Sequence, residues 1–140
     1  MTDRHALGLT IWGECRGEPL EGKLAVASVL RNRLATGRWG HTYESVCRAR
    51  SQFSCWNPTD PNSPALLAFA AQLESGATPE DPALLACLWI ADGLLAGFFP
   101  SPVGAATHYF ATSMKDAPAW AKTGEYVTRI ANHMFFAKVP

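Results

Sequence analysis

Residues 7–27 read LGLTIWGECRGEPLEGKLAVA, and the first part of this stretch has the spacing of a buried helix with one acid in it. An α-helix advances by about 100° per residue, so Leu7, Ile11 and Glu14 lie on one stripe of its surface. Core residues occupy the first two of these positions. The carboxylate of Glu14 is therefore expected to point toward the interior at the end of the helix.

The residues around Glu14 suit a proton-transferring acid. Gly13, Gly17 and Pro19 end the helix there and leave little side-chain bulk beside the carboxyl group. An apolar neighbour such as Trp12 removes water from the charged form, which raises the pKa of a carboxyl group and allows it to carry a proton near neutral pH. The alternative is that Glu14 caps a loop or forms an ion pair with one of three arginines, Arg16, Arg31 or Arg33.

The periodicity and the turn residues predict a mainly α protein with a small β-sheet, an α+β arrangement in one domain over residues 1–140. Expected helices run from a Thr2 or Asp3 cap to about Glu14, from Leu20 to Leu34, around Glu44 to Arg48, from Pro64 to Leu73, and from an Asp81 cap to about Gly97. Expected strands are Thr107 to Thr112, Tyr126 to Ile130, and a third over His133 to Lys138.

The charge balance excludes a general attraction to polyanions. Twelve basic and twelve acidic residues cancel among 140, which favours neither nucleic acid nor anionic lipid as a partner. Basic residues nevertheless gather in one stretch, and we interpret it as a solvated helix face and loop, with contact to anionic envelope polymers as the alternative. This stretch holds Arg31, Arg33, Arg38, Arg48 and Arg50.

The N-terminus lacks the features of an export signal, and the most apolar stretch lacks those of a membrane span. Residues 1–5 lack the basic and apolar regions of an export signal. The stretch from Pro82 to Pro100 carries Asp92 at its centre and several glycines, so we expect a buried helix there.

The cysteines and histidines lack the spacing of a metal site. Four cysteines occur without a CxxC pair, and HExxH is absent, so we expect neither a metal nor a cofactor. Four free, buried thiols are expected, with a bridge between Cys47 and Cys55 as the alternative.

Four motifs in the same order resemble the SleB-type cell wall hydrolases, the family of spore-cortex-lytic enzymes. The first runs from Ile11 to Ala27 around Trp-Gly-Glu-Cys-Arg-Gly-Glu-Pro and is followed by the pair Asn32 and Arg33. The others are Gln52, Phe53, Ser54 and Trp56 with Cys55 inserted; Thr107, His108, Tyr109 and Phe110 with Pro118 and Trp120; and His133 with Phe135 and Phe136. The likeness covers Leu7 to Phe136 and implies a lysozyme-like fold.

The resemblance implies that Glu14 is the catalytic acid and that Glu18 is structural. Aromatic rings bury the flat faces of sugars while polar groups bind the hydroxyls, which suits the later motifs. His108 and His133 are expected to orient Glu14 or a substrate group, or to be satisfied buried histidines. The expected substrate-binding residues are Gln52, Phe53, Trp56, Thr107, His108, Tyr109, Trp120 and His133. Cys15, Lys23 and Cys55 depart from the family pattern, and Cys55 interrupts the motif of Gln52, Phe53, Ser54 and Trp56.

The resemblance further implies an enzyme that acts on peptidoglycan glycan strands, between N-acetylmuramic acid and N-acetylglucosamine, and we expect it to be a monomer. Without an export signal, such an enzyme is expected to be either a phage endolysin released through a membrane pore or the excised domain of an exported protein. Most glycosidases use two carboxylates, but Asp60 and Asp116 have the context of turn residues. One acid suffices for a lytic transglycosylase, which leaves 1,6-anhydromuramic ends. The alternatives are muramidase hydrolysis, a cysteine amidase or peptidase that uses His108 or His133, and a module that only binds glycan.

Overall fold

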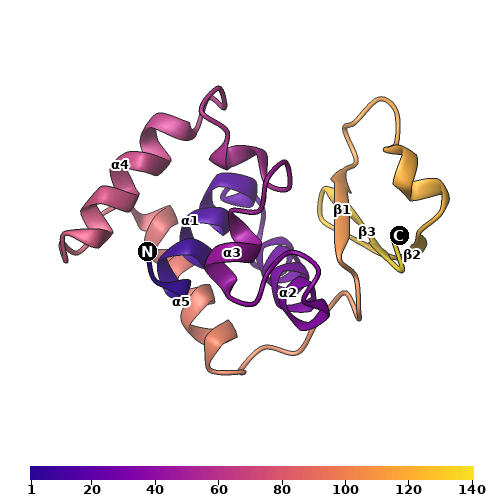
Figure 1. Cartoon of the computed structure of the whole chain (residues 1–140), viewed down its shortest axis with the longest axis horizontal. Coiled ribbons are helices and arrows are strands. Elements are labelled where there is room, and N and C mark those ends of the chain that lie inside the picture. Colours follow the sequence, from indigo (N-terminus) through magenta and orange to yellow (C-terminus); the bar gives the residue numbers. More distant parts are fainter.

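Helical segments occupy the first two thirds of the chain and a small sheet the last third, in a computed structural model that describes residues 1–140 (Figure 1). The helices are α1 (Asp3–Cys15), α2 (Leu20–Thr36), α3 (Tyr43–Cys47), α4 (Ser63–Glu74) and α5 (Pro82–Leu95), with short 3-10 turns at Ser54–Trp56 and Ala119–Lys122. The strands are β1 (His108–Ala111), β2 (Glu125–Ile130) and β3 (His133–Ala137). The predicted fold class is confirmed.

Local signals in the sequence set two of the helix starts. The Thr2 hydroxyl accepts a hydrogen bond of 3.1 Å from the His5 backbone N–H, which makes it the N-cap of α1. The Asp81 carboxylate accepts a bond of 2.8 Å from the Leu84 N–H, and Pro82 occupies the first turn of α5. Both predicted caps are confirmed.

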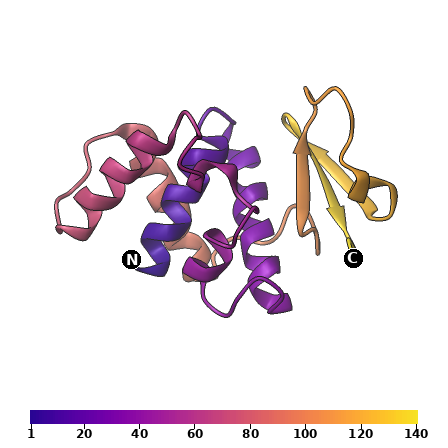
Figure 2. The ribbon, with the colours of Figure 1, turned by 45° about the horizontal axis from the view of Figure 1, so that its top comes forward.

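Helix α1 runs through the middle of the helical body (Figure 2). All residues from Ala6 to Trp12 are buried, because α5, α3, α2 and α4 surround the helix. A helix that is apolar on every side belongs in a core, so the stripe of Leu7 and Ile11 is only part of its buried surface. Glu14, near its C-terminal end, therefore belongs to a helix that is packed on every side.

Helix α5 is a core helix with one exposed side. Leu84, Cys87 and Leu88 are buried against α1, whereas Trp89 on another face is 59% exposed. No helix in the structure has both the length and the apolarity needed to span a bilayer. The prediction of a buried helix therefore holds for one face of α5.

Helix α2 lies between the helical body and the sheet (Figure 1). Val26 and Leu30 belong to the main core, together with residues of α1 and α5. Ala25 and Val29, on another side of α2, form a second apolar cluster with Phe135 of β3 and with Val103 and Ala106 of the segment before β1. The packing of α2 on both sides fixes the position of the sheet relative to α1.

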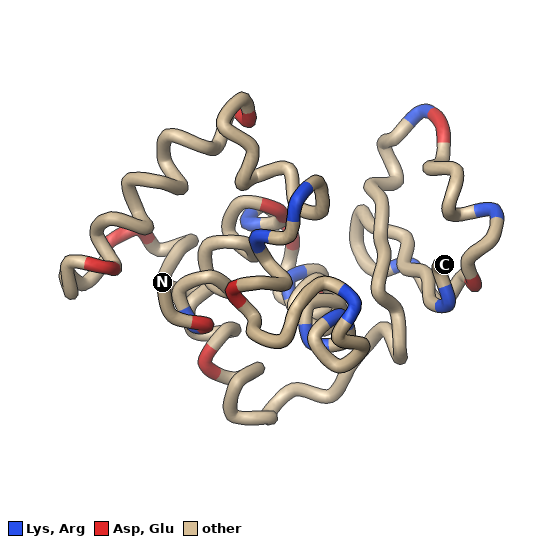
Figure 3. The backbone as a smooth tube through the Cα atoms, viewed as in Figure 1, with Lys and Arg blue, Asp and Glu red and all other residues tan.

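Three consecutive residues of α2 bind the segment that leads into β1. Arg31 donates to the Phe99 carbonyl at 2.6 Å, and Asn32 donates to the Gly104 and Ala106 carbonyls at 2.9 and 2.8 Å. Arg33 donates through Nε to the Thr107 carbonyl at 2.7 Å. Basic residues do gather on α2 and beside it (Figure 3), but Arg33 is only 4% exposed. The interpretation of a solvated face is wrong for Arg33, because its guanidinium binds a buried backbone carbonyl.

The sheet is antiparallel with the order β1-β3-β2, so the last strand lies in the middle. Tyr109 pairs with Phe135, and His108 pairs with Phe136. A register shift between Tyr126 and Thr128 interrupts the pairing of β2 with β3. The central position of β3 places His133, its first residue, at the end of the sheet that faces α1.

The missing side chain of Gly13 makes room for Cys55. A Cβ atom added to Gly13 would lie 2.5 Å from the Cβ atom of Cys55 and 2.8 Å from its sulfur. The sequence suggested that this glycine leaves space for substrate, and the structure corrects that view: the space is filled by the buried Cys55. Nothing lies within 4 Å of the corresponding position at Gly17, which does border open space.

We predict that Gly13→Ala lowers the free energy of unfolding by about 1–3 kcal/mol, the usual range for overpacking. Alanine favours a helix over glycine by about 1 kcal/mol, so propensity alone predicts the opposite sign. Chemical denaturation measures the change, with Gly17→Ala as a matched control expected within about 0.5 kcal/mol of the parent. A Gly13→Ala protein more stable than the parent would contradict the close contact.

Candidate active site

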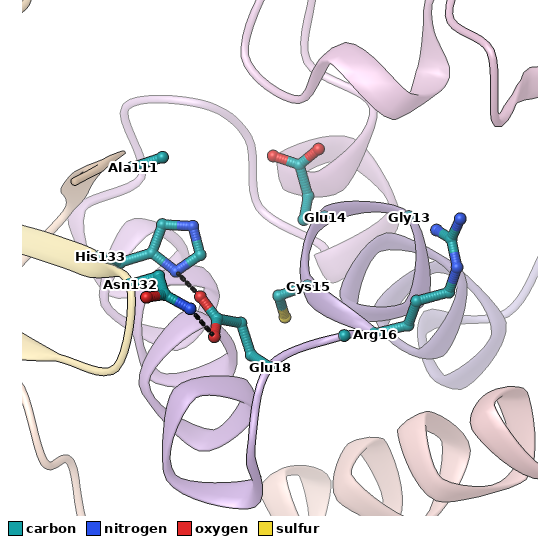
Figure 4. A pocket seen from close by; sticks show the side chains of 9 residues that line it. Gly13, Glu14, Cys15, Arg16, Glu18, Ala111, Asn132 and His133 are labelled. Atoms are coloured by element: carbon teal, nitrogen blue, oxygen red, sulfur yellow. Dashed lines mark hydrogen bonds and ion pairs between the residues drawn. The ribbon is translucent and has the colours of Figure 1, made fainter. Parts of the chain in front are cut away.

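Glu14 lies in a pocket of about 400 Å³ between the end of α1 and the turn that joins β2 to β3 (Figure 4). Helix α1 contributes its last turn and the residues after it, and the sheet contributes its edge. The residues that line this pocket are Gly13, Glu14, Cys15, Arg16, Gly17, Glu18, Ala111, Asn132 and His133. We call it the acid pocket. It joins parts of the chain that are far apart in sequence.

The carboxyl group of Glu14 is held by Tyr109 of β1. The Tyr109 hydroxyl donates a hydrogen bond of 2.9 Å to Glu14 Oε1. Burial raises the pKa of the Glu14 carboxyl above its ordinary value, and the bond from Tyr109 together with contacts to Cys55 acts in the opposite direction by favouring the charged form. The result is a carboxyl group that binds a proton more readily than an exposed one and is stabilised after losing it.

No arginine neutralises Glu14. Arg16 donates to the Trp12 carbonyl and, at 2.8 Å, to Asn62 Oδ1. Arg31 and Arg33 bind backbone carbonyls of the segment before β1. None of the ion pairs in the structure includes Glu14, so the alternative of an ion pair with an arginine is wrong.

Glu18 forms a separate polar cluster on the other side of the acid pocket. Asn132 Nδ2 donates to Glu18 Oε2 at 3.0 Å, and His133 Nδ1 lies 3.1 Å from Glu18 Oε1 without good hydrogen-bond alignment (Figure 4). Burial lowers the pKa of His133, although the nearby Glu18 opposes this effect. One oxygen of Glu18 therefore faces the turn between β2 and β3, and the other faces the first residue of β3, so Glu18 connects the turn after α1 to the sheet.

A second pocket of about 360 Å³ lies on the other side of Tyr109. Its lining residues are Arg33, Arg38, Trp39, Ser51, Gln52, His108, Tyr109, Trp120, Val139 and Pro140, and we call it the arginine pocket. The His108 ring lies between two indoles, 4.9 Å from Trp120 and 5.6 Å from Trp39 by ring centroids. Because Tyr109 lines this pocket and also binds Glu14, the two pockets are neighbours.

The structure brings most of the expected binding residues to these pockets. Gln52, His108, Tyr109 and Trp120 line the arginine pocket, and His133 lines the acid pocket. The hydroxyl of Thr107 lies 2.9 Å from His108 Nδ1, which orients the ring from behind. His108, expected as a possible partner of Glu14, instead lies in the arginine pocket, and the tyrosine that follows it in β1 takes that role.

Two expected binding residues have packing roles instead. Phe53 is 3% exposed and lies beneath the Arg33 guanidinium, 4.9 Å from it. Trp56 packs against the main core and donates from its indole N–H to the Thr10 hydroxyl at 3.0 Å. Neither lines the acid pocket or the arginine pocket. From the sequence alone, an aromatic ring that stacks on a sugar cannot be distinguished from one that packs into the core behind a pocket.

Sequence reasoning missed several residues that line the pockets. Trp39 and Asn132 were given no role, and Arg38 was noted only as part of the basic stretch. Arg33 was considered in that stretch, in a motif and as a possible ion-pair partner of Glu14, but not as a pocket residue. The one available signal was the density of arginines between Arg31 and Arg50. The position of Asn132 between two strands gave no signal, because its partner Glu18 is 114 residues away.

The thiols are not placed to act as nucleophiles. All four cysteines are buried and unpaired. Burial raises the pKa of Cys47 to about 12 and that of Cys87 to about 11, and it raises the pKa of Cys15 and of Cys55 as well. The thiolate is the reactive form, so these groups are poorly suited to attack. No three His, Cys, Asp or Glu side chains converge as a metal site would require.

Comparisons with known proteins show what the chain is similar to. A family model described as cell wall hydrolase matches residues 17–136, a span that begins three residues after Glu14. The catalytic domain of the germination-specific lytic transglycosylase SleB from Bacillus anthracis is 25% identical with a TM-score of 0.63, over 96% of this chain and 93% of that one. The catalytic domain of the Bacillus cereus SleB protein is 25% identical with a TM-score of 0.64, over 96% and 89%.

No curated protein sequence gives a significant match. The two structural likenesses cover nearly all of the chain, including both the helical body and the sheet. They confirm the predicted lysozyme-like fold. The family model covers most of the chain, so this protein belongs to the SleB-type cell wall hydrolases.

Proposed function

We propose that this chain cleaves the glycan strands of peptidoglycan between N-acetylmuramic acid and N-acetylglucosamine, with Glu14 as the catalytic acid and residues 1–140 as one catalytic domain. Membership of the cell wall hydrolase family supports peptidoglycan as the polymer and the cell wall as the place of action. The observation that carries the proposal is the unpaired carboxyl group of Glu14, bound by Tyr109 at a pocket between α1 and the sheet.

Glu14 is protonated in the first step. It donates its proton to the oxygen of the glycosidic bond while the bond from that oxygen to C1 of the muramic residue breaks, and the bonding electrons leave with the oxygen. The raised pKa of Glu14, which results from burial, keeps the proton available. The Tyr109 hydroxyl then stabilises the carboxylate that remains.

The same carboxylate acts as a base in the second step. It accepts the proton of the C6 hydroxyl of the muramic residue while that oxygen bonds to C1, which gives a 1,6-anhydro ring and returns Glu14 to its starting state. This route requires no second carboxylate. The similar Bacillus anthracis protein is a lytic transglycosylase, which supports the route for this chain.

The other acids near the cleft are occupied. Glu18 is the only other carboxylate that lines the acid pocket, and its oxygens face Asn132 and His133. Asp60 accepts a hydrogen bond of 2.8 Å from the Asn62 backbone N–H, as a turn residue does. Asp116 is exposed and lines neither pocket. A hydrolytic mechanism would need one of these acids to activate water.

We expect Glu14→Gln to lower the rate of wall lysis by about 10²–10⁴-fold, the usual contribution of a general acid. The amide keeps the size of the side chain and can still accept the bond from Tyr109, so the fold and the binding of insoluble walls should persist. Turbidity loss and co-sedimentation measure the two quantities. Glu21→Gln, an exposed change of the same type on α2, is the control, and undiminished lysis by the Glu14 variant would refute the proposal.

The products provide an independent test. Mass spectrometry of muropeptides released from purified walls should show 1,6-anhydromuramic ends, each lighter by one water than a hydrolysed end. Reducing muramic ends as the main product would assign muramidase hydrolysis instead. Products cut only within the peptide stems would exclude glycan cleavage altogether.

We predict that Tyr109→Phe moves the alkaline limb of the pH profile to higher pH. The first step needs protonated Glu14, so activity falls as the pH rises through the Glu14 pKa. The Tyr109 bond lowers this pKa by favouring the charged form, and its loss raises the pKa. The dependence of kcat/KM on pH measures the limb, and a limb that stays in place or moves downward would show that another group sets it.

A further inference from the structure

Two guanidinium groups, those of Arg33 and Arg38, line the arginine pocket, and none of its lining residues is an Asp or a Glu. Both guanidinium groups stack on the ring of Trp39, at 4.3 and 4.7 Å from its centroid. None of the ion pairs in the structure includes either arginine. Two like charges on one ring repel each other, so a stable arrangement favours an anion between or beside them.

Arg33 is the more unusual of the two because it is 4% exposed. A buried charge is costly unless it is paired. Its Nε binds the Thr107 carbonyl and its Nη1 binds Gln52 Oε1 at 3.0 Å, which are both neutral acceptors, and its Nη2 makes no hydrogen bond within the protein. Burial lowers the pKa of Arg33 to about 10, so the group stays charged at neutral pH.

The other groups of the pocket leave this charge uncompensated. Burial and the two arginines lower the pKa of His108 to about 4, so the ring is neutral at physiological pH. Arg38 donates to the main-chain oxygens of Val139 and Pro140 at 2.8 and 2.7 Å, and even a terminal carboxylate at Pro140 would offset only one of the two guanidinium charges. The pocket thus offers net positive charge, a planar donor fork and indole walls. A carboxylate attached to an organic group has the matching chemistry.

The position of the pocket relates this charge to the cleavage site. Tyr109 lines the arginine pocket and binds Glu14 with its hydroxyl, so a single side chain connects this pocket to the proposed catalytic acid. Of the two sugars of peptidoglycan, only the muramic residue has a carboxyl-bearing substituent, the lactyl ether at C3. The lactyl carboxyl is either free or joined to a peptide stem that has carboxylates of its own.

We propose that the arginine pocket binds a carboxylate of the muramic residue next to the cleaved bond, on its lactyl group or its peptide stem, and so selects which sugar is presented to Glu14. The inference rests on the proposed function, because it takes peptidoglycan as the substrate. A volume of about 360 Å³ suits a lactyl group or the first part of a stem. Arg38 is exposed and so is the residue to change, whereas Arg33 also holds the segment before β1.

The test compares walls with free and with blocked carboxyl groups. Purified walls are first treated with hydrofluoric acid to remove phosphate polymers, and half of the sample is then amidated with carbodiimide and methylamine. We expect kcat/KM of the parent to fall about tenfold on amidated walls. Arg38→Gln should lose about the same factor on free walls and should no longer distinguish the two substrates. Arg38→Lys keeps the charge but lacks the planar guanidinium donor. Its kcat/KM on free walls should lie between those of the parent and of Arg38→Gln.

Arg129→Gln is the matched control. Arg129 is an exposed arginine of β2 that also donates to a backbone carbonyl, at 3.2 Å, and lines neither pocket. This variant should keep the full preference for free carboxyl groups. The inference would be overturned if Arg38→Gln kept the full preference for free carboxyl groups, or if the parent cleaved free and amidated walls equally. It would also be overturned if the preference appeared only in walls that keep their phosphate polymers.

Walls stripped of stems by an N-acetylmuramoyl-L-alanine amidase distinguish the two sources of carboxylate. A dependence on Arg38 that remains on stripped walls assigns the lactyl carboxylate, and one found only with stems assigns the stem. The proposed function fails in a different way: the parent would then cleave glycan in none of these walls, or Glu14→Gln would cleave as well as the parent.

Discussion

The attachment of the sheet to helix α2 is the constraint on which the site depends. Asn32 and Arg33 bind carbonyls of the segment before β1, and Ala25 and Val29 pack against Phe135. The polar bonds set the position of this segment along α2, and the apolar cluster sets its distance. Tyr109 can reach Glu14, 95 residues earlier in the chain, only because both are held by α2 and its neighbours.

The environment of Glu14 balances two opposing effects. Burial at the end of the core helix α1 favours the protonated form, while Tyr109 and Cys55 favour the charged form. An acid that first donates and then accepts a proton needs both states to be accessible, and this balance supplies them. Cys55 takes part because Gly13 lets it approach α1 closely. Cys55 is an insertion relative to the family pattern, and Gly13, a residue of the first motif, provides the space for it.

The two pockets beside Tyr109 differ in their electrostatics. On one side Glu18 connects the end of α1 to Asn132 and His133, and this cluster is closed on itself. On the other side Arg33 binds only neutral acceptors, and neither Arg33 nor Arg38 pairs with an Asp or a Glu. Glu14 thus lies between a pocket with a closed carboxylate cluster and a pocket with two guanidinium groups. This asymmetry would give a substrate with one anionic substituent per repeat a preferred direction.

Local sequence patterns were enough to predict the α+β class, the caps at Thr2 and Asp81, and the acid at the end of the first helix, because caps, periodicity and breakers act within a few residues. The motif resemblance supplied the family and the lysozyme-like fold. The sequence did not reveal that Tyr109 rather than a histidine holds Glu14, that Phe53 and Trp56 face the core, or that Arg33 is buried. Those facts depend on the order β1-β3-β2 and on the packing of α2, which bring together residues far apart in the chain. Only the tertiary structure decides such contacts, because the sequence around a residue is the same whether its side chain faces a cleft or packs into the core.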